Sequence, residues 1–229
     1  MGGARGYPPA ARRGSGDGGG APMMDRRPII DDPRFIAAVR GERYAVLLAR
    51  GDVLAACDEA QGALRERLAG LDVVYPRAHL TLASFARGTE IREVQAALDR
   101  WAGATAPVSL RLERIAAFGP PHQVVYATTR KTAPLERAYA RLRRESRLRG
   151  LAPVGGEGGS TDQSEWLPHL SLAYCDRLAD ASWERAVSAA GELSLTSAEC
   201  LVPAIDLVTY DARGEQLIAS IPLRAGRHA

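Results

Sequence analysis

The chain carries the same short motif, His-Leu-hydroxyl-Leu, twice, as HLTL at residues 79–82 and as HLSL at residues 169–172. Each copy lies in a short apolar run that is typical of a β-strand. Each run also follows one segment of helical periodicity and precedes another. A chain that repeats one strand pattern in similar surroundings is expected to fold as two related halves, although the halves share little sequence outside the motifs.

The remaining residues alternate between helical and strand periodicity, and a Gly-Pro-Pro turn at residues 119–121 predicts a hairpin. Helix–strand units mixed with hairpins favour an α+β fold with antiparallel sheets over a doubly wound parallel sheet. No glycine-rich phosphate-binding sequence follows a strand, so neither a Rossmann nor a Walker-type site is supported. The expected helices cover residues 33–40, 52–70, 89–103, 132–149 and 183–190, and the expected strands cover 43–50, 79–85, 108–118, 123–129, 169–175, 192–199, 205–210 and 215–223.

Composition divides the chain into parts. Residues 1–27 are rich in glycine, proline and arginine, and a segment with so few apolar side chains is expected to be a disordered extension. Residues 28–42 form a transitional segment, and residues 43–225 are expected to form a single domain. Within this domain the glycine-rich residues 150–165 predict a mobile loop that is able to act as a lid.

Bulk composition limits the class of protein. The chain is 46% apolar and 25% charged, with a formal net charge of only +3, which is typical of a soluble globular protein. No apolar run approaches the roughly 20 residues that span a membrane, and no secretory signal is recognisable. The three cysteines are widely spaced, without a CxxC pair, which indicates a reduced chain. We therefore expect a cytoplasmic monomer.

The two motifs place chemistry on one face of each strand. Alternate residues of a strand share a face, so His79 and Thr81 should project together, as should His169 and Ser171. If the halves face each other, one imidazole could activate water while the other protonates the leaving oxygen of a phosphate diester. The two hydroxyls could donate to the non-bridging oxygens of the phosphate. This chemistry requires no metal ion.

The histidines also allow other interpretations. A single buried histidine on a strand is most often structural, but two of the four histidines of this chain lie in the same frame, which favours a functional pair. A non-catalytic nucleotide- or RNA-binding module with the same cleft is one alternative. A metal-dependent hydrolase with His79 and His169 as ligands is another, although no HxH, HExxH or nearby carboxylate pattern supports it.

The paired motifs resemble the signature of the 2H phosphoesterase superfamily. The resemblance is greatest to its bacterial branch of 2′-5′ RNA ligase-like proteins, or RNA 2′,3′-cyclic phosphodiesterases. It extends over about residues 43–223 and includes RYAVLL, AFGPPHQVVYA and WLPHLSLAY. It implies a bilobal, pseudo-symmetric α+β fold, with two mainly antiparallel sheets facing a central cleft and helices outside.

The resemblance also implies an activity and the residues that carry it. His79 and His169 would be catalytic, with His169 as the base and His79 as the acid, and Thr81 and Ser171 would bind the phosphate. The implied reaction is metal-independent hydrolysis of a 2′,3′-cyclic phosphate end of RNA, or of a related cyclic or 2′-5′ nucleotide, to a 2′-phosphate. The same site run backwards would ligate RNA ends. No cofactor is expected.

Two further side chains are candidates for substrate binding. Trp166 precedes the second motif, and an aromatic ring can stack on a nucleobase, as in proteins that bind single strands. Arg87 follows the first motif strand and is a candidate to reach the phosphate, although a surface role is the default for an arginine. The arginines of residues 130–149 could contact RNA phosphates, but a solvated helix face is favoured.

Two aromatic residues near the motifs are expected to pack in the core. Phe118 ends a predicted strand next to the hairpin turn, where it could line the cleft, although a place in the core is favoured. Tyr174 lies an odd number of positions from His169, so a regular strand would direct its side chain away from that histidine.

Overall fold

The structure is a computed structural model, and it describes residues 27–148, 153–154 and 166–224. The predictions for residues 1–27 and 150–165 fall almost wholly outside the described residues. The helices are α1 (Pro33–Val39), α2 (Gly51–Arg67), α3 (Ile91–Gly103), α4 (Ala133–Leu148) and α5 (Asp180–Gly191). The strands are β1 (Arg43–Leu48), β2 (His79–Phe85), β3 (Val108–Phe118), β4 (Val124–Thr129), β5 (Pro153–Val154), β6 (His169–Tyr174), β7 (Glu199–Val202), β8 (Ala204–Asp211) and β9 (Gly214–Pro222).

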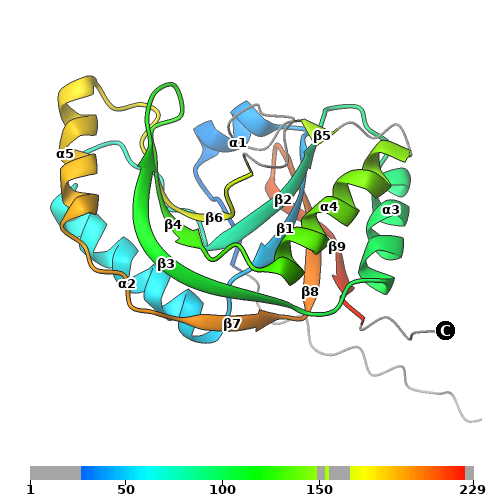
Figure 1. The fold of residues 1–229 in the computed structure, drawn as a ribbon. Coiled ribbons are helices and arrows are strands. Elements are labelled where there is room, and N and C mark those ends of the chain that lie inside the picture. Colours follow the sequence, from blue (N-terminus) through cyan, green and yellow to red (C-terminus); the bar gives the residue numbers. More distant parts are fainter. Residues whose placement is uncertain (1–26, 149–152, 155–165, 225–229) are drawn as a thin grey trace, which may run out of the picture.

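The strands form two antiparallel sheets, which confirms the expected α+β fold (Figure 1). The first sheet has the order β5-β2-β1-β8-β9, and the second has the order β6-β4-β3-β7. One motif strand, β2, therefore lies in the first sheet and the other, β6, at an edge of the second. Helices α3 and α4 pack on the first sheet, and α2 and α5 pack on the second. None of the described helices is long and apolar enough to cross a membrane.

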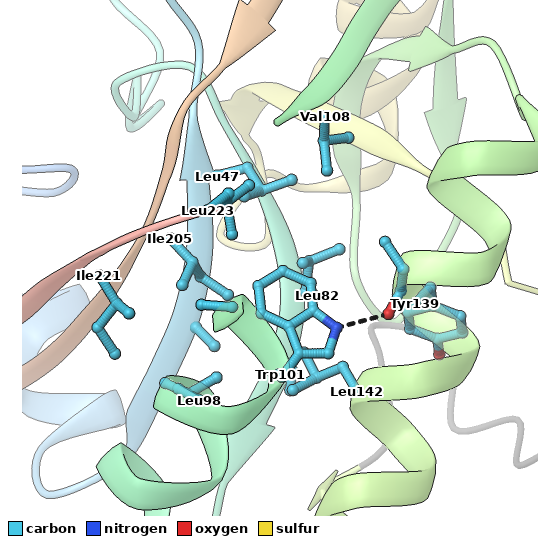
Figure 2. Close-up of a cluster of buried hydrophobic side chains, with 14 of the residues drawn as sticks. Leu47, Leu82, Leu98, Trp101, Val108, Tyr139, Leu142, Ile205, Ile221 and Leu223 are labelled. Carbon is cyan, nitrogen blue, oxygen red and sulfur yellow. Dashed lines mark hydrogen bonds between the residues drawn. The ribbon is translucent and has the colours of Figure 1, made fainter. Parts of the chain in front are cut away.

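Trp101 lies at the centre of the core between the first sheet and its helices. Its side chain is 1% exposed, and its indole Nε1 donates to the carbonyl oxygen of Ala138 in α4 at 2.8 Å (Figure 2). The apolar face of α3, which includes Val94 and Leu98, packs around it. The helical spacing of these residues is therefore the pattern that docks α3 against the sheet.

A third apolar cluster lies between the two sheets. It combines Val46 and Leu48 of the first sheet with Val124 and Tyr126 of the second. Helix α1 packs against the same cluster through residues that include Phe35, so the segment before β1 is part of the packed structure. We call this group the inter-sheet cluster, and it identifies the face of each sheet that is turned toward the other.

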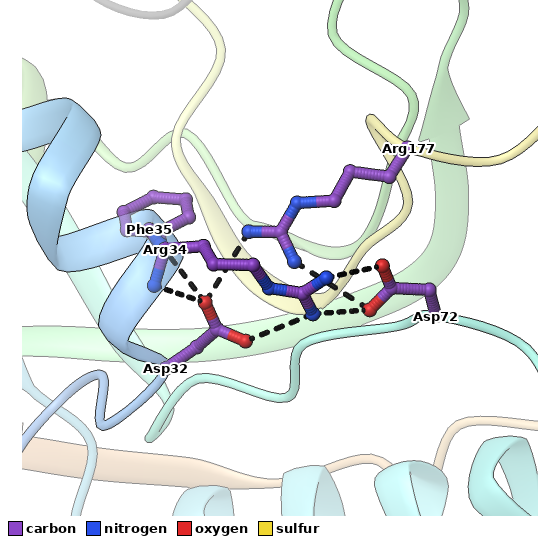
Figure 3. A network of polar contacts seen from close by, with 5 residues as sticks. All are labelled: Asp32, Arg34, Phe35, Asp72 and Arg177. Carbon is purple, nitrogen blue, oxygen red and sulfur yellow. Dashed lines mark hydrogen bonds and ion pairs between the residues drawn. The ribbon is translucent and has the colours of Figure 1, made fainter.

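A charged network joins α1 to the loops that flank the motif strands (Figure 3). Asp32 caps α1 by accepting from the backbone N–H groups of Arg34 and Phe35. Arg34 forms an ion pair with Asp72, which precedes β2, at 2.6 Å, and Arg177, which follows β6, reaches Asp32 at 3.3 Å. The network therefore ties three segments that are distant in sequence to one another.

The last third of the chain differs from the expected elements. Helix α5 begins at Asp180, three residues earlier than predicted, and the predicted strand at 192–199 is wrong because β7 covers Glu199–Val202. Leu193 and Leu195 pack against the core beneath the second sheet, although they lie in an irregular segment. Their alternation reflects alternate burial and not pairing with a neighbouring strand.

Candidate active site

His79 and His169 occupy equivalent places in the two halves, as the first residues of β2 and β6. Nδ1 of His79 lies 2.8 Å from the carbonyl oxygen of Arg77, and Nδ1 of His169 lies 2.9 Å from that of Leu167. Each carbonyl belongs to the residue two positions earlier. A carbonyl oxygen can only accept, so in both rings Nδ1 carries a hydrogen, and in the neutral ring Nε2 is the acceptor nitrogen.

The strand register turns the first pair of functional side chains toward the second sheet. His79 and Thr81 lie opposite Leu48 and Val46 of β1, and both of these partners belong to the inter-sheet cluster. Residues directly opposite each other in a sheet share a face. Leu80 points the other way, into the core beneath α3 and α4, as the sequence predicts.

The register of β6 turns the second pair of functional side chains toward the first sheet. His169 and Ser171 lie opposite Thr128 and Tyr126 of β4, and Tyr126 belongs to the inter-sheet cluster. Leu170 packs on the opposite face, beneath α2 and α5. The structure therefore directs all four predicted side chains into the space between the sheets.

The two histidines also lie at corresponding distances from a point where the halves are hydrogen-bonded to each other. Val74 and Tyr174 exchange two backbone hydrogen bonds, of 3.1 and 2.8 Å, in an antiparallel bridge. His79 lies five positions after Val74, and His169 lies five positions before Tyr174. In an antiparallel arrangement these two steps lead in the same direction. Each histidine therefore lies five residues from the same bridge, and in the same direction along the paired segments.

Both motif strands contain the same irregularity. In β2, Thr81 and Ala83 pair with consecutive residues of β1, so the register skips Leu82. In β6 the register skips Leu172, the equivalent leucine of the second motif. A bulge of this kind reverses the alternation of the residues beyond it. The two halves therefore resemble each other in backbone detail as well as in sequence.

The bulge changes the expected direction of Tyr174. This side chain is buried, as predicted, but it belongs to the inter-sheet cluster and contacts Phe35 with ring centroids 4.9 Å apart. It therefore points to the same face as His169, and the prediction that it faces away was wrong. The reason is the bulge at Leu172, which lies between the two residues.

Two aromatic rings pack around His169. The rings of Phe118 and Tyr126 stack on each other at 4.1 Å, and both meet the imidazole of His169 in tilted or edge contacts at 5.0 and 5.1 Å. Such contacts restrict the orientation of the imidazole. Burial raises the pKa of Tyr126, so its hydroxyl stays neutral near pH 7. The sequence predicts a core position for Phe118 and gives no separate signal for Tyr126, although the predicted hairpin places Tyr126 close to the second motif.

The two additional substrate-binding candidates lie in different surroundings. The indole of Trp166 is half-buried and stacks on Tyr139 of α4, with centroids 3.8 Å apart, so Tyr139 covers one of its faces. Arg87 follows the end of β2 that is remote from His79, where it donates to the carbonyl oxygen of Ala38. The structure does not bring Arg87 to the histidines.

The described residues contain no group of three or more histidine, cysteine or acidic side chains arranged to hold a metal ion. Two cavities, of about 390 and 410 Å³, are lined by other parts of the chain, including Gln95 and Ser220 in the first and Arg65 and Tyr75 in the second. Neither cavity includes His79 or its counterpart in its lining. The candidate site is therefore defined by the facing strands and not by either of these cavities.

Comparison with known proteins agrees with this arrangement. A model of the 2′-5′ RNA ligase superfamily matches residues 63–214, a range that includes both motifs. None of the curated proteins matches the chain.

Solved structures show the same fold. The protein TT0787 of Thermus thermophilus is 25% identical, with a TM-score of 0.61, over 82% of this chain and 100% of that protein. LigT of E. coli in its apo form is 15% identical, with a TM-score of 0.54, over 80% of this chain and 96% of LigT. The complex of LigT with 3′-AMP gives 16% identity and a TM-score of 0.51 over 80% and 98% of the two chains. The chain therefore belongs to the 2′-5′ RNA ligase superfamily, within the 2H phosphoesterases.

Proposed function

We propose that this protein is a metal-independent phosphodiesterase that hydrolyses 2′,3′-cyclic phosphate ends of RNA, or a related cyclic or 2′-5′ nucleotide, to a 2′-phosphate. One observation carries the proposal. His79 and His169 lie on facing strands, and the same backbone contact fixes the same tautomer in both. In-line displacement at phosphorus needs a base and an acid on opposite sides of the phosphate, and two such imidazoles can supply both.

In the proposed reaction His169 is neutral and His79 is protonated when the substrate binds. Nε2 of His169 takes a proton from water as the water oxygen attacks phosphorus. The bond from phosphorus to the 3′ oxygen breaks, and Nε2 of His79 gives its proton to that oxygen. The products are a 2′-phosphate and a 3′-hydroxyl. The hydroxyls of Thr81 and Ser171 donate to the non-bridging oxygens as charge develops there.

The family is one of phosphoesterase- and ligase-like enzymes, and this supports an enzymatic role for the chain. LigT of E. coli has been solved with 3′-AMP and with ATP, which supports a nucleotide or an RNA end as the ligand here. Trp166 would contact a base through the face of its indole that Tyr139 leaves uncovered. The three cysteines are free thiols, which supports a reducing compartment such as the cytoplasm, where we expect a monomer.

The test is hydrolysis, in EDTA, of an RNA oligonucleotide that ends in a 2′,3′-cyclic phosphate. We expect a product that ends in a 2′-phosphate, and we expect its formation to be lost in His79→Ala and in His169→Ala. His122→Ala is the matched control, because His122 is an exposed histidine in the turn before β4. Full activity in both motif variants would overturn the proposal. Nucleotide binding without turnover by the wild type would favour the binding module instead.

A further inference from the structure

A buried amide lies between the segment that leads into β2 and strand β6. Gln61 of α2 is only 1% exposed, and it shares the apolar face of the helix with Cys57 and Leu64. Its Nε2 donates to the carbonyl oxygen of Pro76 at 2.7 Å and to that of Leu172 at 2.9 Å. These two carbonyls belong to different halves of the molecule. The side chain of Gln61 thus donates two hydrogen bonds, one to each half of the molecule.

The position of this contact follows from the antiparallel bridge. Val74 and Tyr174 exchange both of their backbone hydrogen bonds. In a regular antiparallel ladder the next pair of this kind would lie two residues further on, between Pro76 and Leu172. Proline has no backbone N–H, so it cannot donate to the carbonyl oxygen of Leu172. Gln61 supplies donors to both carbonyl oxygens at the position where the direct ladder ends.

This geometry affects the histidines directly. Pro76 lies three positions before His79, and Leu172 lies three positions after His169. An amide placed between two strands holds them further apart than a direct N–H to carbonyl bond does, because both carbonyls must reach the same nitrogen. We propose that Gln61 is a positioning residue that sets the separation of the two histidines. Its catalytic consequence rests on the proposed function.

The helix makes this separation rigid. Cys57 and Leu64, on either side of Gln61 along α2, are fully buried against the second sheet. The amide is therefore carried by a packed element and not by a mobile loop. A small displacement of catalytic groups is costly, since an error of about 1 Å can reduce a rate about 10²-fold. Binding of the nucleotide depends less on the distance between the imidazoles.

The first test is Gln61→Met, which keeps an unbranched side chain of similar length but removes the donors. We expect kcat to fall about 10²-fold while KM changes less than about threefold, because the histidines are misplaced and the nucleotide contacts remain. Cys57→Ala is the matched control, because it alters the same buried face one helical turn away without touching either carbonyl. A fall in kcat no larger than that of the control would overturn the proposal.

A second variant separates positioning from stability. Gln61→Met combined with Pro76→Ala restores a backbone N–H that can donate to the carbonyl oxygen of Leu172. The strands can then pair directly, so we expect the thermal stability to recover while kcat stays low, because direct pairing draws the strands together. Recovery of kcat together with stability would overturn the proposal, because it would mean that the amide of Gln61 only satisfies the two carbonyl oxygens.

A third measurement does not depend on turnover. The imidazole ¹H–¹⁵N signals of His79 and His169 are recorded with and without inorganic phosphate. We expect the signals of both histidines to shift in Gln61→Met and the signals of neither histidine to shift in Cys57→Ala. If the wild type hydrolyses no nucleotide, the proposed function fails and this measurement alone decides. Unchanged signals for both histidines would then overturn the role of Gln61.

Discussion

His79 and His169 hold their Nδ1 atoms against the carbonyl oxygens of the residues two positions earlier, at 2.8 and 2.9 Å. The same local contact in both halves gives both imidazoles the same tautomer, in which Nε2 is the acceptor nitrogen of the neutral ring. Their surroundings differ, however. His169 packs against the rings of Phe118 and Tyr126, whereas the cross-strand partner of His79 is Leu48. The two imidazoles have the same tautomer but different surroundings, and this difference supports the proposed division of His79 as the acid and His169 as the base.

The division can be tested with a substrate whose bridging 3′ oxygen is replaced by sulfur. A thiolate leaves without being protonated, so it does not need the acid. We expect His79→Ala to lose about 10²–10⁴-fold in rate on the oxygen substrate and to recover most of that loss on the sulfur substrate. His169→Ala should remain slow on both substrates. The opposite pattern in a steady-state assay would exchange the two roles.

The motif hydroxyls give a second prediction. Thr81→Ala and Ser171→Ala each remove one donor to the phosphate, so we expect kcat to fall about 10²-fold in each. Thr81→Ser keeps the hydroxyl and should retain most of the activity. Circular dichroism of all three variants would check that the fold is unchanged. Equal losses in Thr81→Ala and Thr81→Ser would mean that packing, and not hydrogen bonding, matters at this position.

The fold class and the placement of the motif side chains were predictable because they depend on strand periodicity. The period of two directed His79 and Thr81 to one face and Leu80 to the other, as the structure shows. The same rule failed for Tyr174, because a bulge at Leu172 reverses the alternation. A bulge leaves no periodic signal in a single sequence, so it could not be anticipated.

Contacts between distant segments were less accessible to sequence analysis. Arg34, Asp72 and Arg177 meet only after the chain has folded, and their spacing follows no helical or strand period. Gln61 is different, because it lies four residues after Cys57 and three before Leu64, inside an apolar stripe. A polar residue in such a stripe predicts a buried hydrogen-bonded contact, since a polar group that is buried without a partner is costly.

The stability of the first core gives a third prediction. Trp101 is almost fully buried and donates to the carbonyl oxygen of Ala138 (Figure 2). We expect Trp101→Ala to lower the free energy of unfolding by about 3–5 kcal/mol through lost burial and the cavity that remains. Urea unfolding would measure this loss. Leu201→Ala is the control, because Leu201 is 62% exposed and its removal should change stability by less than about 0.5 kcal/mol.

The charged network gives a prediction about pH. Burial opposes ionisation of Asp32, but hydrogen bonds from Phe35 and Arg177 and the charge of Arg177 outweigh it and lower the pKa of this carboxyl (Figure 3). A carboxyl whose pKa is lower in the folded state adds stability above its unfolded pKa of about 3.9, and this stability is lost as the pH falls through the folded value.

Asp32→Asn tests this linkage, because asparagine still caps a helix but carries no charge. We expect the melting temperature of Asp32→Asn to lie below that of the wild type at pH 7, by an amount that corresponds to about 1 kcal/mol or less, since the network is partly exposed. The difference should shrink below about pH 4 as the wild-type carboxyl is protonated. Asp31→Asn, which removes a neighbouring exposed charge, is the matched control. A difference between Asp32→Asn and the wild type that stayed constant from pH 7 to pH 3 would mean that the charge of Asp32 does not stabilise the fold.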